Sequence, residues 1–132
     1  MTRNEKAPFK LHSLGQFALP VSDADRAEQF YADTLGLKRL FRFGDLVFFD
    51  CDGVRLMLEG TTGTIAPSGG VCHYFKVKDI DSAVVGLVNS GVVFDDEPHL
   101  IANMPDHELW MTFFRDPDGH TLALMEERML EE

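Results

Sequence analysis

The chain has 132 residues, of which 45% are hydrophobic, and a formal net charge of −10 at pH 7. This length and composition suit one compact domain, spanning 1–132, that buries a hydrophobic core. The acidic charge argues against a nucleic-acid partner, because a phosphate backbone is bound by clustered lysine and arginine. No run of about 18 apolar residues is present, so no membrane-spanning helix and no membrane partner is expected.

The first half of the chain predicts one strand, one helix and three further strands. In the first strand, Phe17, Leu19 and Val21 alternate with residues of the opposite face. Ser22 or Asp23 is a suitable helix cap. An apolar stripe at helical spacing follows the cap as far as Gly36. The strands are expected at 14–21, 37–43, 46–50 and 54–59.

The second half repeats this plan after a linker expected at 60–70. Strands are expected at 71–78, at 109–114 and at 121–125, with a further strand that starts over 92–94 and a helix over 79–90. The polar stretch 95–107 is interpreted as a long loop, and long loops in compact domains are often functional.

Two sequence patterns occur twice in the same order. The run that begins at Val21 recurs 56 residues later at Val77, and the run that begins at Asp50 recurs 66 residues later at Asp116. A chain built from two copies of one unit usually places its working site where the copies meet.

Cysteine usage and the N-terminal residues bear on the compartment. Cys51 and Cys72 form no CxxC motif and have no neighbouring ligand cluster, which favours reduced thiols in a cytosolic protein. The first residues carry charges without a following apolar block, which does not match a signal peptide. A cytoplasmic location is therefore expected.

The repeated segments resemble the vicinal oxygen chelate superfamily, the group of glyoxalases, bleomycin-resistance proteins and extradiol dioxygenases. The resemblance is carried by Val21-Ser22-Asp23, Phe30-Tyr31, Thr34-Leu35-Gly36-Leu37, Val77-Lys78-Asp79-Ile80-Asp81 and Phe113-Phe114-Arg115-Asp116-Pro117-Asp118-Gly119-His120. It implies an α+β fold of two tandem βαβββ modules, over about 12–59 and 71–127, that form an open cup-shaped mixed sheet.

The resemblance also implies where metal-using members of the superfamily hold their ligands. These are concave-face positions on the first and last strand of each module, here Gln16, Met57, Cys72 and Ala123. Gln16 is a suitable ligand, but Met57 suits hard metals poorly and Ala123 has no donor atom. A standard metal site and a cofactor are therefore not expected, and a divalent metal remains the alternative.

Three further residues are candidates, namely Tyr74, Trp110 and His107. Tyr74 shares a strand face with Cys72, and Trp110 is the only tryptophan, but both faces of its strand carry large apolar side chains. His107 is the best general-base candidate, because neighbouring Asp106 can raise its basicity. His120 follows a turn and is expected at the surface.

Two functions from different classes remain open at this stage. The first is a metal-free protein of the drug-sequestering or resistance type, which binds a small apolar or aromatic molecule in the cup through Gln16, Met57, Cys72, Tyr74, Trp110 and Ala123. The alternative is a lyase, isomerase or dioxygenase with a non-standard metal site. The expected partner is a small molecule, and a homodimer remains an open alternative.

Overall fold

The computed structural model describes residues 9–62, 64–67 and 71–131. The N-terminal residues 1–8, which lack a signal-peptide pattern, and positions 63 and 68–70 of the expected linker lie outside these ranges. Module 1 contains β1 (Gln16–Val21), α1 (Ala24–Gln29), the π-helical turn η2 (Phe30–Thr34), β2 (Lys38–Phe43), β3 (Leu46–Cys51) and β4 (Val54–Gly60). Module 2 contains β5 (His73–Lys76), α2 (Ile80–Asn89), β6 (His99–Asn103), β7 (His107–Arg115) and β8 (Thr121–Met129).

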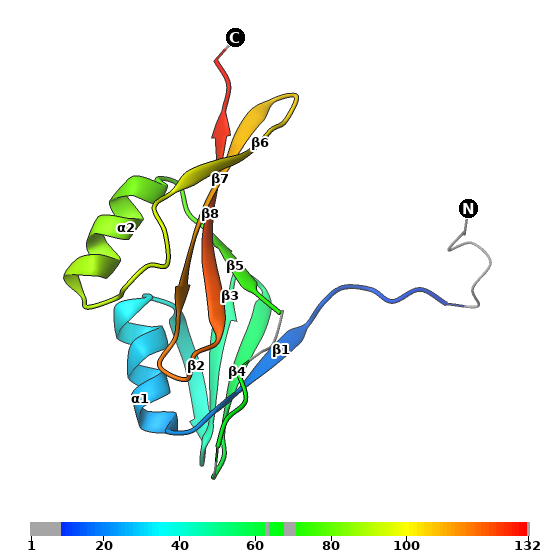
Figure 1. Cartoon of the computed structure of the whole chain (residues 1–132). Helices are drawn as coiled ribbons and strands as arrows, with labels where there is room; N and C mark the ends of the chain where they lie inside the picture. The colour runs from blue at the N-terminus through cyan, green and yellow to red at the C-terminus, as the bar shows by residue number, and fades with distance from the viewer. Residues whose placement is uncertain (1–8, 63, 68–70, 132) are drawn as a thin grey trace.

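Each module forms its own four-stranded mixed sheet. The strand orders are β1-β4-β3-β2 and β5-β8-β7-β6, so β1 and β5 are edge strands. In both sheets the first strand runs parallel to the last, and the other pairs are antiparallel. Both helices lie on the same side of the strands (Figure 1). The predicted fold of two tandem βαβββ modules is confirmed.

The repeated sequence builds the two helices in the same way. The Asp23 carboxylate accepts the backbone N–H of Arg26 at 3.1 Å, and the Asp79 carboxylate accepts that of Ser82 at 3.2 Å. Such side-chain caps satisfy amide donors that have no partner within the helix. After each helix the chain turns at a glycine with positive φ, +77° at Gly36 and +98° at Gly91.

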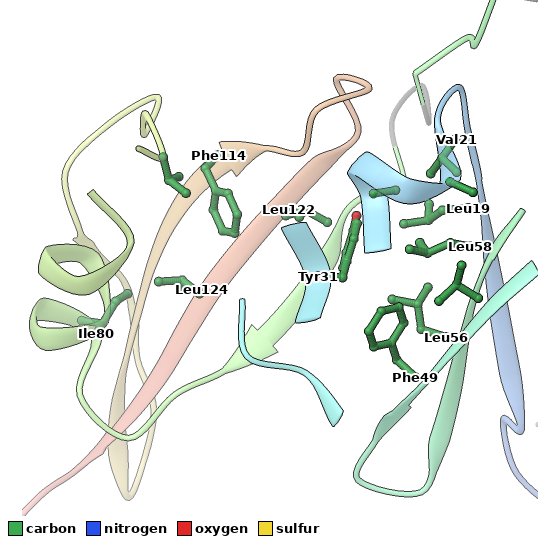
Figure 2. Close-up of a cluster of buried hydrophobic side chains, with 14 residues drawn as sticks. Leu19, Val21, Tyr31, Phe49, Leu56, Leu58, Ile80, Phe114, Leu122 and Leu124 are labelled. Atoms are coloured by element: carbon green, nitrogen blue, oxygen red, sulfur yellow. The ribbon is translucent and has the colours of Figure 1, made fainter. Parts of the chain in front are cut away.

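Alternate residues of the strands face the helices and form the core. We call this side of each sheet the helix side and the other side the open face. Figure 2 shows Tyr31 between the apolar side chains of module 1 and Leu122 of module 2. Both modules therefore share one core, whose buried members are Leu19, Val21, Ala24, Ala27, Tyr31, Val47, Phe49, Leu56, Leu58, Ile80, Val92, Phe114, Leu122 and Leu124.

The structure corrects the prediction of a loop over 95–107. β6 lies inside that segment and pairs with β7, which already begins at His107. The apolar run at Leu100 and Ile101 is short and is flanked by Pro98 and Pro105, which hid the strand signal. The strand predicted to start at 92–94 is reduced to a single bridge between Phe94 and Phe114.

The structure bears on two expectations, the state of the two cysteines and the absence of a membrane-spanning helix. Cys51 and Cys72 are free and partly buried. Within the described ranges, no helix has the length and apolar character needed to cross a membrane.

Candidate functional site

The open face of module 1 holds two of the predicted ligand positions. Gln16 on β1 and Met57 on β4 lie opposite the core residues Leu19 and Leu56. The Gln16 amide donates to the Met57 sulfur, with 3.9 Å between Nε2 and Sδ. The strand alternation therefore places both side chains on one face, as predicted from the sequence.

Beside Met57 lies an aromatic group that the sequence interpretation missed. Phe41 and Phe48 stack with ring centroids 4.6 Å apart and an interplanar angle of 22°. The Arg55 guanidinium lies 6.0 Å and 5.9 Å from the two centroids. Phe41 is 45% exposed, whereas Phe48 beneath it is 8% exposed. We call Phe41, Phe48 and Arg55 the aromatic platform.

A sequence signal for this platform does exist. A two-residue turn at Gly44-Asp45 pairs Phe43 with Leu46 and therefore Phe41 with Phe48, which is the observed register. Cross-strand aromatic neighbours in an antiparallel pair are close enough to contact one another. Applying the turn rule to the hairpin predicts the pair.

The open face of module 2 surrounds Ala123. This residue pairs with Tyr74 on β5 and with Phe113 on β7. The rings of Tyr74 and Phe113 lie edge to face with their centroids 6.2 Å apart. Ala123 is fully buried, whereas Tyr74 is 48% exposed. The flanking aromatic rings therefore occupy the space beside this small residue.

Trp110 lies on the other side of its sheet. It shares the helix side of β7 with Thr112 and Phe114, both fully buried. Its Nε1 donates to Glu108 at 3.0 Å, and the Arg128 guanidinium lies 4.7 Å from its ring centroid. Grouping Trp110 with Ala123 on one ligand-binding face was therefore wrong. Both faces of this strand are apolar, so alternation alone did not decide the orientation.

Cys72 lies just before β5, where the edge strands of the two modules meet. Phe17 on β1 stacks against His73 on β5 with centroids 4.6 Å apart, on the helix side. Burial raises the pKa of the Cys72 thiol. The thiol is therefore protonated at neutral pH, which weakens it as a metal ligand.

His107 forms the predicted pair with Asp106, at 2.7 Å between Nδ1 and Oδ1. This hydrogen bond lowers the pKa of the Asp106 carboxyl. His107 pairs with Met129 at one end of β7, whereas Phe113 lies near the other end. The structure does not bring His107 to the predicted ligand positions, and its catalytic role remains a prediction.

His120 is buried, and its expected surface position was wrong. Its side chain is fully covered, and Nε2 donates to the Pro20 carbonyl at 2.7 Å. The turn before β8 packs against the end of β1, where Ser22 Oγ donates to Asp118 Oδ1 at 2.6 Å. A local turn motif does not reveal such a contact between modules.

Comparisons with known proteins identify the family. The family model for the Glyoxalase/Bleomycin resistance protein/Dioxygenase superfamily matches residues 13–124. The chain belongs to this superfamily. A comparison of this chain with curated protein sequences finds no match.

Solved structures of this superfamily share the fold. A member from Sphaerobacter thermophilus is 26% identical, with a TM-score of 0.69 over 89% of this chain and 98% of its own. An antibiotic-binding protein from a Streptomyces species is 25% identical, with a TM-score of 0.70 over 90% and 98%. Lactoylglutathione lyase from Agrobacterium tumefaciens is 21% identical, with a TM-score of 0.69 over 89% and 95%, a likeness that shows the fold alone.

The side chains at the metal positions implied by the resemblance do not fit a divalent metal. Ala123 has no donor atom and is buried, and the Met57 thioether already accepts from Gln16. The described part of the chain contains no group of three or more His, Cys, Asp or Glu side chains that could hold a metal ion. A catalytic zinc usually has three protein ligands, which this set does not supply.

Proposed function

We propose that this protein binds a small planar aromatic molecule on its open face, without a metal ion, in the manner of a drug-sequestering protein. The observation that carries the proposal is the exposed aromatic platform of Phe41, Phe48 and Arg55 beside Gln16 and Met57.

The platform offers two kinds of contact to such a ligand. The exposed ring of Phe41 provides a surface for offset stacking, which contributes beyond simple area burial. Arg55 and Gln16 carry N–H groups that can donate to carbonyl or hydroxyl oxygens of a ligand. A mostly apolar surface with a few polar groups that fix orientation is typical of small-molecule sites.

The superfamily context supports this role. An antibiotic-binding protein shares the fold over nearly the whole length of both chains. We include a cytoplasmic location in the proposal, supported by two free cysteines.

A titration with 1,4-dihydroxyanthraquinone, a neutral planar molecule with carbonyl and hydroxyl oxygens, tests the proposal. We expect saturable binding in fluorescence anisotropy and affinity at least about tenfold weaker in Phe41→Ala, because truncation removes the stacking surface. Phe43→Ala is the matched control, since Phe43 lies on the same strand, is 72% exposed and is not part of the platform. Equal loss in both variants, or no loss in Phe41→Ala, would contradict the assignment.

A further inference from the structure

A pocket of about 1140 Å³ lies between the two modules, beside α2 and the end of η2, and none of the aromatic platform residues lines it. We call it the intermodule pocket. Module 1 contributes the end of η2 and the β3–β4 turn to its walls, and module 2 contributes β5 and α2. It includes Cys72 and Tyr74 of the predicted ligand set, but not Gln16, Met57, Trp110 or Ala123.

The internal repeat explains why a pocket is present here. The offset of 66 residues pairs Asp50 with Asp116 and Val54 with His120. When the helix caps of the two modules are aligned, Tyr31 corresponds to Leu87. When the glycines that follow the two helices are aligned instead, Tyr31 corresponds to Gly86. The two alignments differ because the module 1 helical segment, which ends in the π-helical turn, is one residue longer.

One of the two repeat-related junctions is closed by buried polar contacts. Tyr31 Oη donates to Asp116 Oδ2 at 2.7 Å, and His120 Nε2 donates to the Pro20 carbonyl at 2.7 Å. Tyr31 and His120 are fully buried. These two large side chains fill the space between η2 and the turn before β8.

The other junction lacks both of these side chains. Gly86 and Leu87, which correspond to Tyr31, have no hydroxyl that could donate to Asp50. Val54, which corresponds to His120, has no ring nitrogen that could donate to a carbonyl of β5. Gly86, Leu87, Asp50 and Val54 all line the intermodule pocket. The pocket therefore corresponds, at the second junction, to the space that Tyr31 and His120 fill at the closed one.

The lining favours a neutral and largely apolar occupant. Burial raises the pKa of the thiols of Cys51 and Cys72, so both are uncharged at neutral pH. The charges of the lining residues sum to zero, because the lining holds two lysines and two aspartates, Lys38, Lys76, Asp50 and Asp52.

His73 adds a polar group to this apolar wall. It lines the pocket, and its buried Nδ1 has no hydrogen-bond partner in the described part of the chain. Burial lowers the pKa of His73, and nearby His120 lowers it further. The neutral imidazole has one nitrogen that accepts a hydrogen bond, and buried polar atoms of this kind are usually satisfied.

We propose that the intermodule pocket is a second ligand site, which takes a neutral, mostly apolar molecule of drug-like size. None of the aromatic platform residues lines this pocket, so a ligand bound here is additional to the one proposed on the platform.

The test uses N-phenyl-1-naphthylamine, a neutral probe with one N–H group whose fluorescence rises in apolar surroundings. We expect saturable brightening with the whole chain. Gly86→Tyr places a ring where the pocket is open, since a Cβ at Gly86 meets no heavy atom within 4 Å. Its affinity for the probe is expected to fall by about tenfold or more.

Four further measurements control the result. Gly86→Ala removes the helical glycine without filling the pocket and retains binding, as does Phe41→Ala on the aromatic platform. Leu87→Tyr fills the pocket from the adjacent position and also loses the probe. In the unaltered chain, the probe slows alkylation of Cys51 and Cys72 by iodoacetamide, which requires no variant to fold.

Defined outcomes overturn the proposal. They are no brightening with the unaltered chain, unchanged affinity in folded Gly86→Tyr and Leu87→Tyr, or cysteine alkylation that the probe does not slow. Loss of the probe in Phe41→Ala alone would place it on the aromatic platform, and would overturn the pocket while leaving the proposed function intact.

Discussion

Tyr31 joins the two modules through a single buried hydrogen bond. Its hydroxyl donates to Asp116, whose other carboxylate oxygen accepts the backbone N–H groups of Asp118 and His120. Burial first, and then the charge of Asp116, raise the pKa of Tyr31, so the phenol stays protonated and remains a donor. Asp116 thus fixes both the β7–β8 turn and, through Tyr31, the position of that turn on module 1.

Tyr31→Phe should therefore destabilise the fold. The substitution leaves one oxygen of a buried carboxylate without its partner, which costs roughly 1.5–3 kcal/mol. Urea denaturation measures the change in the free energy of unfolding. The other tyrosine offers a control, because Tyr74 is 48% exposed and Tyr74→Phe should change stability by no more than about 0.5 kcal/mol. Equal effects in the two variants would contradict this role for Tyr31.

At the residue scale, strand alternation predicted some positions and failed at others. Gln16 and Met57 lie on the open face, as the family resemblance implied, and the clear alternation of apolar and other residues along β1 and β4 accounts for it. Trp110 was ambiguous, since both faces of β7 are apolar. His120 was misplaced because its burial depends on a contact with Pro20, 100 residues away in the chain.

At the scale of elements, α2 is anchored to β8 by a buried carboxylate. Glu126 accepts the backbone N–H of Ile80, the first residue of α2, at 3.0 Å. The hydrogen bond from Arg128 lowers the pKa of Glu126, and the bond from Ile80 lowers it further. A negative charge at a helix N-terminus is favourable, because unpaired N–H groups point toward it.

Stability should therefore depend on the protonation of Glu126. Because its pKa is lower in the folded chain, its stabilising effect is complete above the ordinary glutamate pKa of about 4.3 and is lost as pH falls through the folded-state value. We expect Glu126→Gln to lower the melting temperature at pH 7, and the gap between the two proteins to narrow as pH falls below about 4.3. A thermal melt series across this range checks it, and a constant gap between the two proteins would contradict it.

The elements themselves were largely predictable, apart from β6 and the strand expected to start over 92–94. Caps, glycine stops and alternation predicted both helices and most strands, because each signal is local. β6 was missed, since its pairing with β7 is a tertiary contact and its five residues lie between two prolines. The intermodule pocket was also beyond a local interpretation, because it depends on how two repeats differ after they pack.

At the scale of the whole molecule, the account predicts independence from metal. The ligand positions implied by the family resemblance hold Gln16, Met57, Cys72 and Ala123, a set without enough donors for a divalent ion. We expect elemental analysis to find no stoichiometric divalent metal in the purified protein. Chelation should leave the melting temperature unchanged, since a bound metal stabilises the folded state by mass action.

The most direct test titrates 1,4-dihydroxyanthraquinone, which itself chelates free metal ions, into protein treated with a chelator and into the same protein incubated with nickel, zinc, iron or manganese and then freed of unbound metal. The account predicts the same affinity in every sample, and affinity at least about tenfold weaker in Phe41→Ala throughout. Binding or turnover that appears only after a metal is restored, and that Phe41→Ala leaves unchanged, would contradict it.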